Sequence, residues 1–289
     1  MICTLCPRRC GAERTAEAGG GFCRMPAGLR VARAMLHRWE EPPISGRNGA
    51  GTVFFSGCTL GCVYCQNGDI SAGGFGKDIS TARLREIFEE LIGQGAHNIE
   101  LVTPTHFLPW ILPALTPRLP VPVVYNCGGY ERAETLRTLE GLVDVYLPDL
   151  KYADGTLAAA LSGAADYFPV ACQAIREMFR QVGPYVLEDG LLKRGVVIRH
   201  LVLPGYLDNT RQVLDWIAET FGPGDVLVSL MSQYTPTNNM TGRLARRVTA
   251  AEYRAAAAYM RNCGITDGFV QERTSAEEAY TPAFDGQGV

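Results

Sequence analysis

The stretch from Thr52 to Asn67, TVFFSGCTLGCVYCQN, joins a short apolar strand directly to a loop that carries three cysteines. The cysteines are Cys58, Cys62 and Cys65, so their spacing is Cys-x3-Cys-x2-Cys. A closed zinc site or a structural iron–sulfur cluster usually takes four protein ligands, and no fourth ligand lies next to this loop. On a four-iron cluster, three thiolates would leave one iron free to bind a ligand. The loop therefore indicates a functional metal site rather than a stabilising one.

A regular series of strands and helices follows this loop. The strands that we expect span residues 52–56, 98–103, 122–126, 143–147, 196–203 and 226–231, with a short edge strand at 269–271. The expected helices span residues 81–94, 107–115, 133–140, 165–182, 209–221 and 250–262. Apolar strands that alternate with helices predict a parallel sheet covered by helices, and about six units are too few for a closed eight-stranded barrel. The predicted fold class is therefore α/β, as an open or partial barrel.

Three segments are expected along the chain. Residues 1–47 are rich in Gly, Arg, Pro and Cys and should form a small Cys-rich, metal-binding extension. Residues 48–275 form the barrel, and residues 276–289 form a C-terminal tail. The run from Trp39 to Gly46 links the extension to the barrel, and its acids Glu40 and Glu41 are expected on a solvated face.

Polar residues follow the expected strands at their carboxyl ends, which is where open parallel sheets bind ligands. They are Ser56-Gly57-Cys58, Thr103-Pro104-Thr105-His106, Asn126-Cys127-Gly128-Gly129, Asp149-Leu150-Lys151, Pro204-Gly205-Tyr206 and Ser232-Gln233-Tyr234. This repeated placement predicts one site on one edge of the sheet.

Composition and charge exclude several classes of protein. The 27 basic and 30 acidic residues give a net charge of −3, and no basic stripe suggests a nucleic acid partner. No apolar run reaches the ~18 residues that span a bilayer, and the N-terminus lacks the apolar region of a signal peptide. We expect a soluble, cytoplasmic protein that binds neither nucleic acid nor membrane.

Four further cysteines cluster near the N-terminus: Cys3, Cys6, Cys10 and Cys23. In a reducing compartment such a cluster favours a metal over disulfides, so we expect zinc or an auxiliary iron–sulfur cluster, with two disulfides as the alternative. The isolated Cys127, Cys172 and Cys263 are expected to be small buried side chains.

The cysteine loop, with Tyr64 before its last cysteine, resembles that of the radical S-adenosylmethionine superfamily. Gln66-Asn67 is similar to the branch named for the pyruvate formate-lyase activating enzyme. Asp149-Leu150-Lys151 resembles the Asp-x-Lys element of glycyl-radical activating enzymes, and residues 199–205, RHLVLPG, resemble their later strand. The Cys-Pro-Arg-Arg-Cys run at 6–10 and the segment 37–43 resemble a subgroup that is labelled activating-enzyme-like. The likeness runs from about residue 50 to residue 275.

The resemblance implies a partial (β/α)6 barrel and a [4Fe–4S] cluster on Cys58, Cys62 and Cys65. It implies that the methionine part of S-adenosylmethionine chelates the open iron through its amine and carboxylate. An electron from the reduced cluster would then break a C–S bond, and the 5′-deoxyadenosyl radical would take a hydrogen atom from the substrate. An electron donor such as flavodoxin or ferredoxin is implied as a partner.

One feature departs from the family pattern. The family often has Gly-Gly-Glu at the end of the second strand to hold the cosubstrate amino group, whereas this chain has Val102-Thr103-Pro104-Thr105 there. The amino group would then be held by backbone carbonyls, or by Glu100 if the register shifts.

Single residues are then expected to have roles. Asp149 and Lys151 are expected to contact the cosubstrate because of their motif, and Tyr64, Asn126, Gly128 and Arg199 because of their surroundings in the sequence. The expected substrate contacts are His106, Gln233 and Tyr234, which lie at strand ends. Structural alternatives remain open: core packing for Tyr64, a simple turn at residues 126–129, a surface pair for Asp149 and Lys151, and an internal ion pair for Arg199. His200 faces away from Arg199 and is expected to pack under a helix. Cys127 lies near the site as a buried thiol, with a radical relay or a substrate contact as the alternative.

Three functions compete. The first is a radical enzyme that activates a glycyl radical enzyme by removing a backbone glycine hydrogen. The second is radical modification of a small molecule or a peptide side chain. The third is a non-enzymatic iron–sulfur electron carrier. An open barrel mouth would favour the first, and a mouth capped by residues 1–47 and the tail would favour the second.

Overall fold

The computed structural model describes residues 2–17, 19–237, 240–271 and 282–289 of the 289-residue chain. The expected barrel reaches residue 275 and the expected tail begins at residue 276, so residues 272–281 of these two segments lie outside the described parts. In the described parts, no helix is long and apolar enough to cross a membrane.

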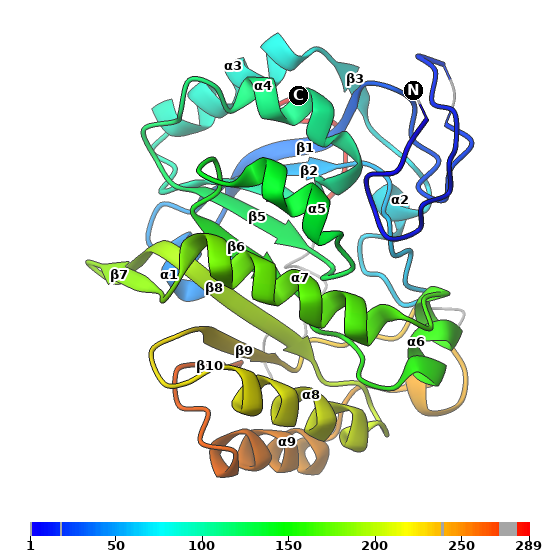
Figure 1. Cartoon of the computed structure of the whole chain (residues 1–289), viewed down its shortest axis with the longest axis vertical. Helices are drawn as coiled ribbons and strands as arrows, with labels where there is room; N and C mark the ends of the chain where they lie inside the picture. The colour runs from blue at the N-terminus through cyan, green and yellow to red at the C-terminus, as the bar shows by residue number, and fades with distance from the viewer. Residues whose placement is uncertain (1, 18, 238–239, 272–281) are drawn as a thin grey trace.

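A mostly parallel sheet forms the centre of the molecule (Figure 1). Its parallel strands are hydrogen-bonded in the order β2 (Ala50–Phe55), β4 (Ile99–Val102), β5 (Val123–Cys127), β6 (Val145–Pro148), β8 (Leu191–Leu201), β9 (Leu227–Met231) and β10 (Gly268–Val270). Three antiparallel strands complete it: β1 (Leu29–His37) on β2, β3 (Lys77–Ile79) on β1, and β7 (Val186–Glu188) on β8. The edge strands β3 and β10 are not paired with each other, so the sheet is open and the predicted fold class is confirmed.

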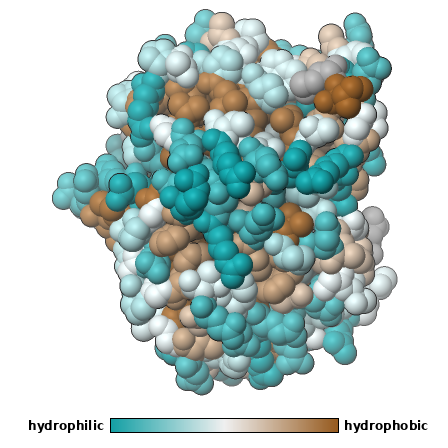
Figure 2. Space-filling model, viewed as in Figure 1, coloured by the Kyte–Doolittle hydropathy of each residue, from teal (hydrophilic) through white to brown (hydrophobic). Residues whose placement is uncertain are grey.

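Helices cover the outer face of the sheet. The longer ones are α3 (Thr81–Gly93), α7 (Tyr167–Val182), α8 (Leu207–Thr220) and α9 (Ala250–Asn262), and the shorter ones are α4 (Leu108–Ala114), α5 (Ala133–Leu136) and α6 (Gly155–Ser162). Hydrophilic side chains gather in the middle of this face, over α5 and α7 (Figure 2). There Arg180 pairs with Glu140 and Glu177, which marks the solvent side of the helical layer.

The inner face of the sheet divides into an apolar layer and a polar layer. Side chains alternate between the two faces of a strand, so inner-face residues recur at every second position. At the amino ends of the strands, Ile44 of the one-turn helix α1 (Pro42–Ser45) packs against Val124, Val145 and Val197. Towards the carboxyl ends, the same face carries polar side chains, among them Glu100, Asn126, Asp149, Arg199 and Ser229.

Several elements were not expected from the sequence: the strands β1, β3 and β7 and the short helices α1, α2 (Gly68–Ser71) and α6. Residues 29–37, which we expected in the extension, form β1 of the central sheet. Their alternation is obscured because Arg30 and Arg33 interrupt the apolar residues and the register shifts between Val31 and Arg33. Helix α6 was also not expected; it is short, begins at a cap by Asp154 and ends at Gly163 in the left-handed conformation.

The N-terminal segment, residues 2–17 and 19–27, lies at the carboxyl-end side of the sheet, beside α2 (Gly68–Ser71) and the cysteine loop before it (Figure 1). The described tail, residues 282–289, runs along β1, where the backbone N–H of Ala34 donates to the carbonyl of Gln287. These two segments therefore flank the first strands of the sheet.

Candidate functional site

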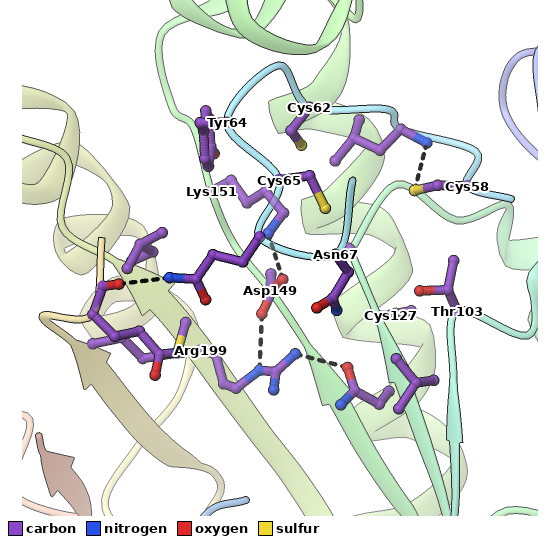
Figure 3. A pocket seen from close by; sticks show the side chains of 18 of the residues that line it. Cys58, Cys62, Tyr64, Cys65, Asn67, Thr103, Cys127, Asp149, Lys151 and Arg199 are labelled. Carbon is purple, nitrogen blue, oxygen red and sulfur yellow. Dashed lines mark hydrogen bonds and ion pairs between the residues drawn. The ribbon is translucent and has the colours of Figure 1, made fainter. Parts of the chain in front are cut away.

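A cavity of about 260 Å³ opens at the carboxyl ends of the parallel strands (Figure 3). The strands contribute Phe54 (β2), Val102 (β4), Asn126 and Cys127 (β5), Arg199 and Leu201 (β8) and Met231 (β9), and the residues directly after strands contribute Thr103, Gly128 and Asp149. Cys58, Cys62 and Cys65 line it from the loop after β2. The structure thus brings the cysteine loop together with residues from five of the six expected strand-end segments, whereas Pro204-Gly205-Tyr206 does not line the cavity.

The three cysteines of this loop are free thiols whose sulfurs accept hydrogen bonds. The backbone N–H groups of Leu60 and Gly61 donate to Sγ of Cys58 at 3.3 and 3.5 Å. The hydroxyl of Ser162, at the end of α6, donates to Sγ of Cys62 at 3.1 Å. Donors of this kind orient cluster thiolates and set the electronic properties of the metal.

The electrostatics of the thiols fit a metal cluster. Burial raises the pKa of the Cys58 thiol to about 12, and the neighbouring thiols of Cys62 and Cys65 raise it further. Burial also raises the pKa of Cys65, so a bound metal would supply the positive charge that keeps Cys58 and Cys65 as thiolates. Among the described residues, no three cysteine, histidine or carboxylate side chains converge closely enough for a single metal ion.

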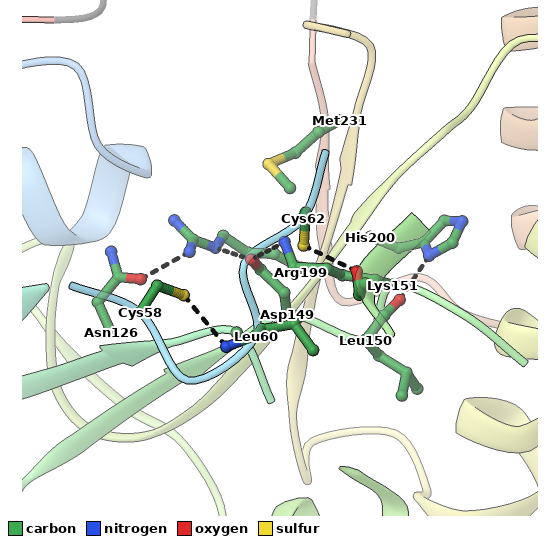
Figure 4. Close-up of polar contacts among 12 residues, drawn as sticks. Cys58, Leu60, Cys62, Asn126, Asp149, Leu150, Lys151, Arg199, His200 and Met231 are labelled. Atoms are coloured by element: carbon green, nitrogen blue, oxygen red, sulfur yellow. Dashed lines mark hydrogen bonds and ion pairs between the residues drawn. The ribbon is translucent and has the colours of Figure 1, made fainter. Parts of the chain in front are cut away.

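An ion-pair network forms the wall of the cavity opposite the thiols. Asp149 is 8% exposed; its carboxylate accepts from Nε of Arg199 at 2.8 Å and pairs with the ammonium of Lys151 (Figures 3 and 4). Burial opposes the charge on Lys151, but Asp149 beside it raises the pKa of Lys151 overall. Nη2 of Arg199 donates to Oδ1 of Asn126 at 2.7 Å. Asp149 and Lys151 are thus a buried pair and not a surface pair. Arg199, which lies among apolar residues in the sequence, forms an internal ion pair with Asp149.

The linker acids Glu40 and Glu41 do not form the solvated face that we expected. Glu40 lines the cavity, and its carboxylate accepts from Nη1 of Arg199 at 3.1 Å and from Nδ2 of Asn126 at 3.2 Å. Burial raises the pKa of Glu41 to about 7, and nearby Glu40 adds to this shift. The reason lies in α1. Because Ile44 of this helix packs against the inner face of the sheet, the acids that precede the helix lie next to the cavity instead of in solvent. The only sequence signal was the apolar Pro-Pro-Ile run that follows them.

Glu100, the carboxylate that could replace the missing family motif, lies beneath the cavity rather than on its wall. It is fully buried on β4, where it accepts from the hydroxyl of Thr52 at 2.6 Å and from Nδ2 of Asn126 at 2.7 Å. Burial and the charge of Glu40 raise its pKa. Glu40 and Asp149 are thus the carboxylates that line the cavity in the described parts of the chain.

The remaining expected residues fall into two groups. Tyr64, Gly128, Gln233 and Tyr234 line the cavity. His106 does not: it is 1% exposed, and its Nε2 lies 2.7 Å from the carbonyl oxygen of Ser56. His200 also faces away from the cavity and contacts Leu150 and Thr210 of α8, as expected for a residue that packs under a helix.

Tyr64 belongs to a chain of hydroxyl contacts that reaches a cluster sulfur. Its hydroxyl lies 2.7 Å from that of Tyr152, which lies 2.8 Å from the hydroxyl of Ser162, the donor to Cys62. Its ring is 5.8 Å from that of Tyr234. Tyr64 is therefore part of the packing around the cysteine loop as well as part of the cavity wall.

The N-terminal cysteines lie apart from the cavity. Burial raises the pKa of Cys6 to about 12, with contributions from Cys23 and Cys3, and it raises the pKa of Cys23, with contributions from Cys3 and Cys10. The four thiols are thus neighbours, although in the described parts of the chain they do not converge as ligands of one ion. The metal expected here stays a prediction.

Glu131 is a buried carboxyl behind the cavity, and it makes the stability of the protein depend on pH. It accepts from the hydroxyl of Thr105 at 2.8 Å and from that of Tyr125 at 3.4 Å. Burial raises its pKa from 4.5 to about 8, although these hydrogen bonds lower it in part. Between about pH 4.5 and pH 8, the folded state therefore keeps a proton on Glu131 that the unfolded state has released.

We expect the free energy of unfolding to fall as pH rises from about 5 to 8, by at most about 1.4 kcal/mol per pH unit from this group. In Glu131→Gln this contribution disappears, so its stability curve should be flatter in the same window, as measured by urea unfolding at each pH. The exposed neighbour Glu134 has a lowered pKa, so Glu134→Gln should keep the wild-type slope. Equal slopes for wild type and Glu131→Gln would contradict the assignment.

Comparisons with known proteins agree with this fold. No model of a protein family matches the chain. An uncharacterized protein of Methanocaldococcus jannaschii, MJ0674, is 32% identical over 246 residues, which cover 81% of this chain and 66% of that protein. The chain therefore spans slightly less than two thirds of the length of this relative.

Solved structures share the architecture at low sequence identity. SuiB of Streptococcus suis bound to S-adenosylmethionine has a TM-score of 0.53 and 13% identity, covering 75% of this chain and 48% of that one. HydG, a maturase of the [FeFe]-hydrogenase, has a TM-score of 0.53 and 14% identity, covering 78% and 52%. Methylornithine synthase (PylB) has a TM-score of 0.50 and 14% identity, covering 74% and 61%. The chain thus has the fold of these proteins over about half of their length.

Proposed function

We propose that this protein is a radical S-adenosylmethionine enzyme that uses a [4Fe–4S] cluster on Cys58, Cys62 and Cys65. The observation that carries the proposal is that the three free thiols of one short loop line a cavity at the carboxyl ends of a parallel sheet, where Cys127 of β5 is the further cysteine of the wall in the described parts of the chain. The resemblance of the cysteine loop supports it, as does the fold shared with SuiB, which binds S-adenosylmethionine in one of its structures. The chemistry that the bound cluster supplies is one-electron cleavage of the sulfonium into methionine and a 5′-deoxyadenosyl radical.

The residues of the cavity suit such a cosubstrate. Gly128 has no side chain, so a ligand can approach the backbone at the end of β5. Asn126, Lys151 and Asp149 offer hydrogen-bond donors and acceptors for an amino acid and a ribose. Phe54, Leu201 and Met231 form apolar walls that exclude water from a reactive radical. We assign Glu40 and Asp149, the carboxylates on the cavity wall, to the cationic part of the cosubstrate.

The decisive experiment is anaerobic reconstitution with iron and sulfide, reduction with dithionite, and analysis of the products. We expect S-adenosylmethionine to be converted to methionine and 5′-deoxyadenosine. A protein that holds four irons but cleaves no S-adenosylmethionine would instead be the electron carrier. Deuterium transfer into 5′-deoxyadenosine from labelled candidates then identifies the substrate.

A second, finer proposal is that the substrate is a peptide or protein, with activation of a glycyl radical enzyme as one case. It is favoured by the position of residues 2–17 and 19–27, which pack beside the cysteine loop and contribute no residue to the cavity wall. His37, Trp39 and Glu40, which follow this segment, and Pro282 of the tail do line the cavity, so the proposal of a polypeptide substrate depends on residues 2–17 and 19–27 leaving part of the mouth open. SuiB has been crystallised with its precursor peptide SuiA. Deuterium transfer from a glycine-labelled partner protein, but from no small molecule, is the expected result.

We also propose a cytoplasmic location and a small electron-transfer protein, such as flavodoxin or ferredoxin, as the reductant. All ten cysteines are free thiols, which suits a reducing compartment.

At the N-terminus we propose zinc or a second iron–sulfur cluster on Cys3, Cys6, Cys10 and Cys23. Metal analysis of anaerobically purified protein should find metal beyond the four irons of the barrel cluster. Cys6→Ala should lose this extra metal and keep the barrel irons, whereas Cys172→Ala, which removes a buried thiol of α7, should lose neither. Identical metal contents of wild type and Cys6→Ala would count against an N-terminal site.

A further inference from the structure

Arg8 lies outside the cavity, and its guanidinium binds backbone carbonyls of two distant segments. Nε donates to the carbonyl of Thr59 at 3.0 Å, and Nη2 donates to that of Leu60 at 3.1 Å. Nη2 also donates to the carbonyl of Ser162 at 2.6 Å, and Nη1 donates to that of Gly163. Because a guanidinium has five N–H donors in one plane, this single side chain ties the N-terminal segment to the cysteine loop and to the end of α6.

The two loop carbonyls belong to the peptide groups that donate to Sγ of Cys58. A peptide group is planar, with C=O and N–H on opposite sides. The carbonyl of Thr59 shares a peptide with the N–H of Leu60, and the carbonyl of Leu60 shares the next one with the N–H of Gly61. These are the N–H groups at 3.3 and 3.5 Å from the sulfur. Arg8 therefore holds each carbonyl on one side so that each N–H faces the sulfur on the other, and its charge polarises both groups.

At α6, Arg8 supports the donor to a second sulfur. The last carbonyls of a helix have no partner within the helix, and Arg8 satisfies two of them at Ser162 and Gly163. This fixes the residue whose hydroxyl donates to Cys62. One arginine thus supports the hydrogen-bond donors of two of the three loop thiols.

Aromatic packing holds the guanidinium in place. Its central carbon lies 3.8 Å from the ring centre of Phe22. Phe22 in turn lies against Gly61, where an added Cβ would come within 3.1 Å of the ring. The N-terminal segment thus contacts the cysteine loop through both its cation and its aromatic ring.

We propose that Arg8 is a positioning residue that orients the hydrogen-bond donors of Cys58 and Cys62 and thereby raises the reduction potential of the cluster on the cysteine loop. The physical reason is that hydrogen bonds to the sulfurs and a nearby positive charge favour the more negatively charged, reduced cluster. The part that concerns the potential rests on the proposed function, whereas the orientation of the peptide groups does not.

The test compares Arg8→Ala and Arg8→Lys with Arg9→Ala. Arg9 is the matched control because it is the adjacent arginine, is exposed, and makes no hydrogen bond to the loop in the described parts of the chain. The first measurement is amide hydrogen exchange at Leu60 and Gly61 in the cluster-free protein. The second is the midpoint potential of the reconstituted cluster, followed by electron paramagnetic resonance.

In Arg8→Ala we expect exchange at both amides to be faster by about fivefold or more, as for the loss of one hydrogen bond, and the potential to become more negative. Arg8→Lys keeps the charge but cannot bridge the carbonyls, so both values should lie between those of wild type and Arg8→Ala. Arg9→Ala should match wild type. If Arg8→Ala does not fold, amide exchange and the midpoint potential are compared between Arg8→Lys and wild type instead.

Unchanged exchange in the Arg8 variants would overturn the orienting role, and faster exchange with an unchanged potential would overturn the effect on the cluster. A wild-type protein that cannot be reconstituted with iron would refute the proposed function and the claim about the potential together. The exchange measurement would still decide whether Arg8 orients the loop, so the two failures can be told apart.

Discussion

Cys62→Ala is expected to abolish reductive cleavage of S-adenosylmethionine. The rate should fall by more than about 100-fold, because substituting a residue that only hydrogen-bonds to a metal ligand already costs about 10- to 100-fold. The reason is that Cys62 is one of the three loop thiols that would hold the cluster, so its removal leaves two irons without a ligand from this loop. The measurements are 5′-deoxyadenosine formation and the iron content of the reconstituted protein. Cys58→Ala and Cys65→Ala should behave in the same way.

The matched control is Cys263→Ala, which removes a partly buried thiol near Asp215, far along the chain from the loop. It should retain the wild-type iron content and rate. Full activity of Cys62→Ala, or an equal loss in Cys263→Ala, would show that the loop is not the cluster site.

Arg199→Met is expected to destabilise the protein by about 3–5 kcal/mol, because it leaves buried carboxylates without their cation. Arg199 pairs with Asp149 at 2.8 Å and with Glu40 at 3.1 Å, and all three side chains are 12–13% exposed. Asp149 would keep Lys151, but Glu40 would have no cationic partner among its described contacts. The measurement is urea unfolding of the metal-free protein at neutral pH.

The control is Arg30→Met, which breaks the more exposed ion pair with Asp78, whose side chains are 28% and 62% exposed. Exposed pairs contribute about 0–1 kcal/mol, so this change should be small. If the two substitutions lowered the free energy of unfolding equally, the ion pairs of Arg199 would contribute no more to stability than an exposed pair does.

The regular part of the fold could be predicted because local signals there agree with the tertiary structure. The helix expected at 250–262 is α9, which begins at a capping box between Thr249 and Glu252. The strands expected after residue 50 are all present, with boundaries that differ by a few residues. In these elements the apolar period and the capping residues point to the same structure.

The site could be predicted where a short motif carries it, and not where distant segments meet. The cysteines and the strand-end residues lie close to sequence signals. Glu40, in contrast, contacts Arg199 across 159 positions of the chain, and Arg8 contacts Ser162 across 154. No local pattern encodes such contacts. His106 follows a strand, as a site residue should, but the turn Thr105–Phe107 directs its ring toward Ser56 instead of the cavity.

The central claim is that one iron of the cluster has no protein ligand and binds S-adenosylmethionine. The direct measurement is electron paramagnetic resonance of the anaerobically reduced protein, recorded with and without S-adenosylmethionine and followed by isotope-labelled cosubstrate to detect coupling to its amine and carboxylate. The account predicts a changed spectrum with coupling to both groups. An unchanged spectrum from a protein that contains four irons, or zinc as the only metal of the cysteine loop, would contradict it.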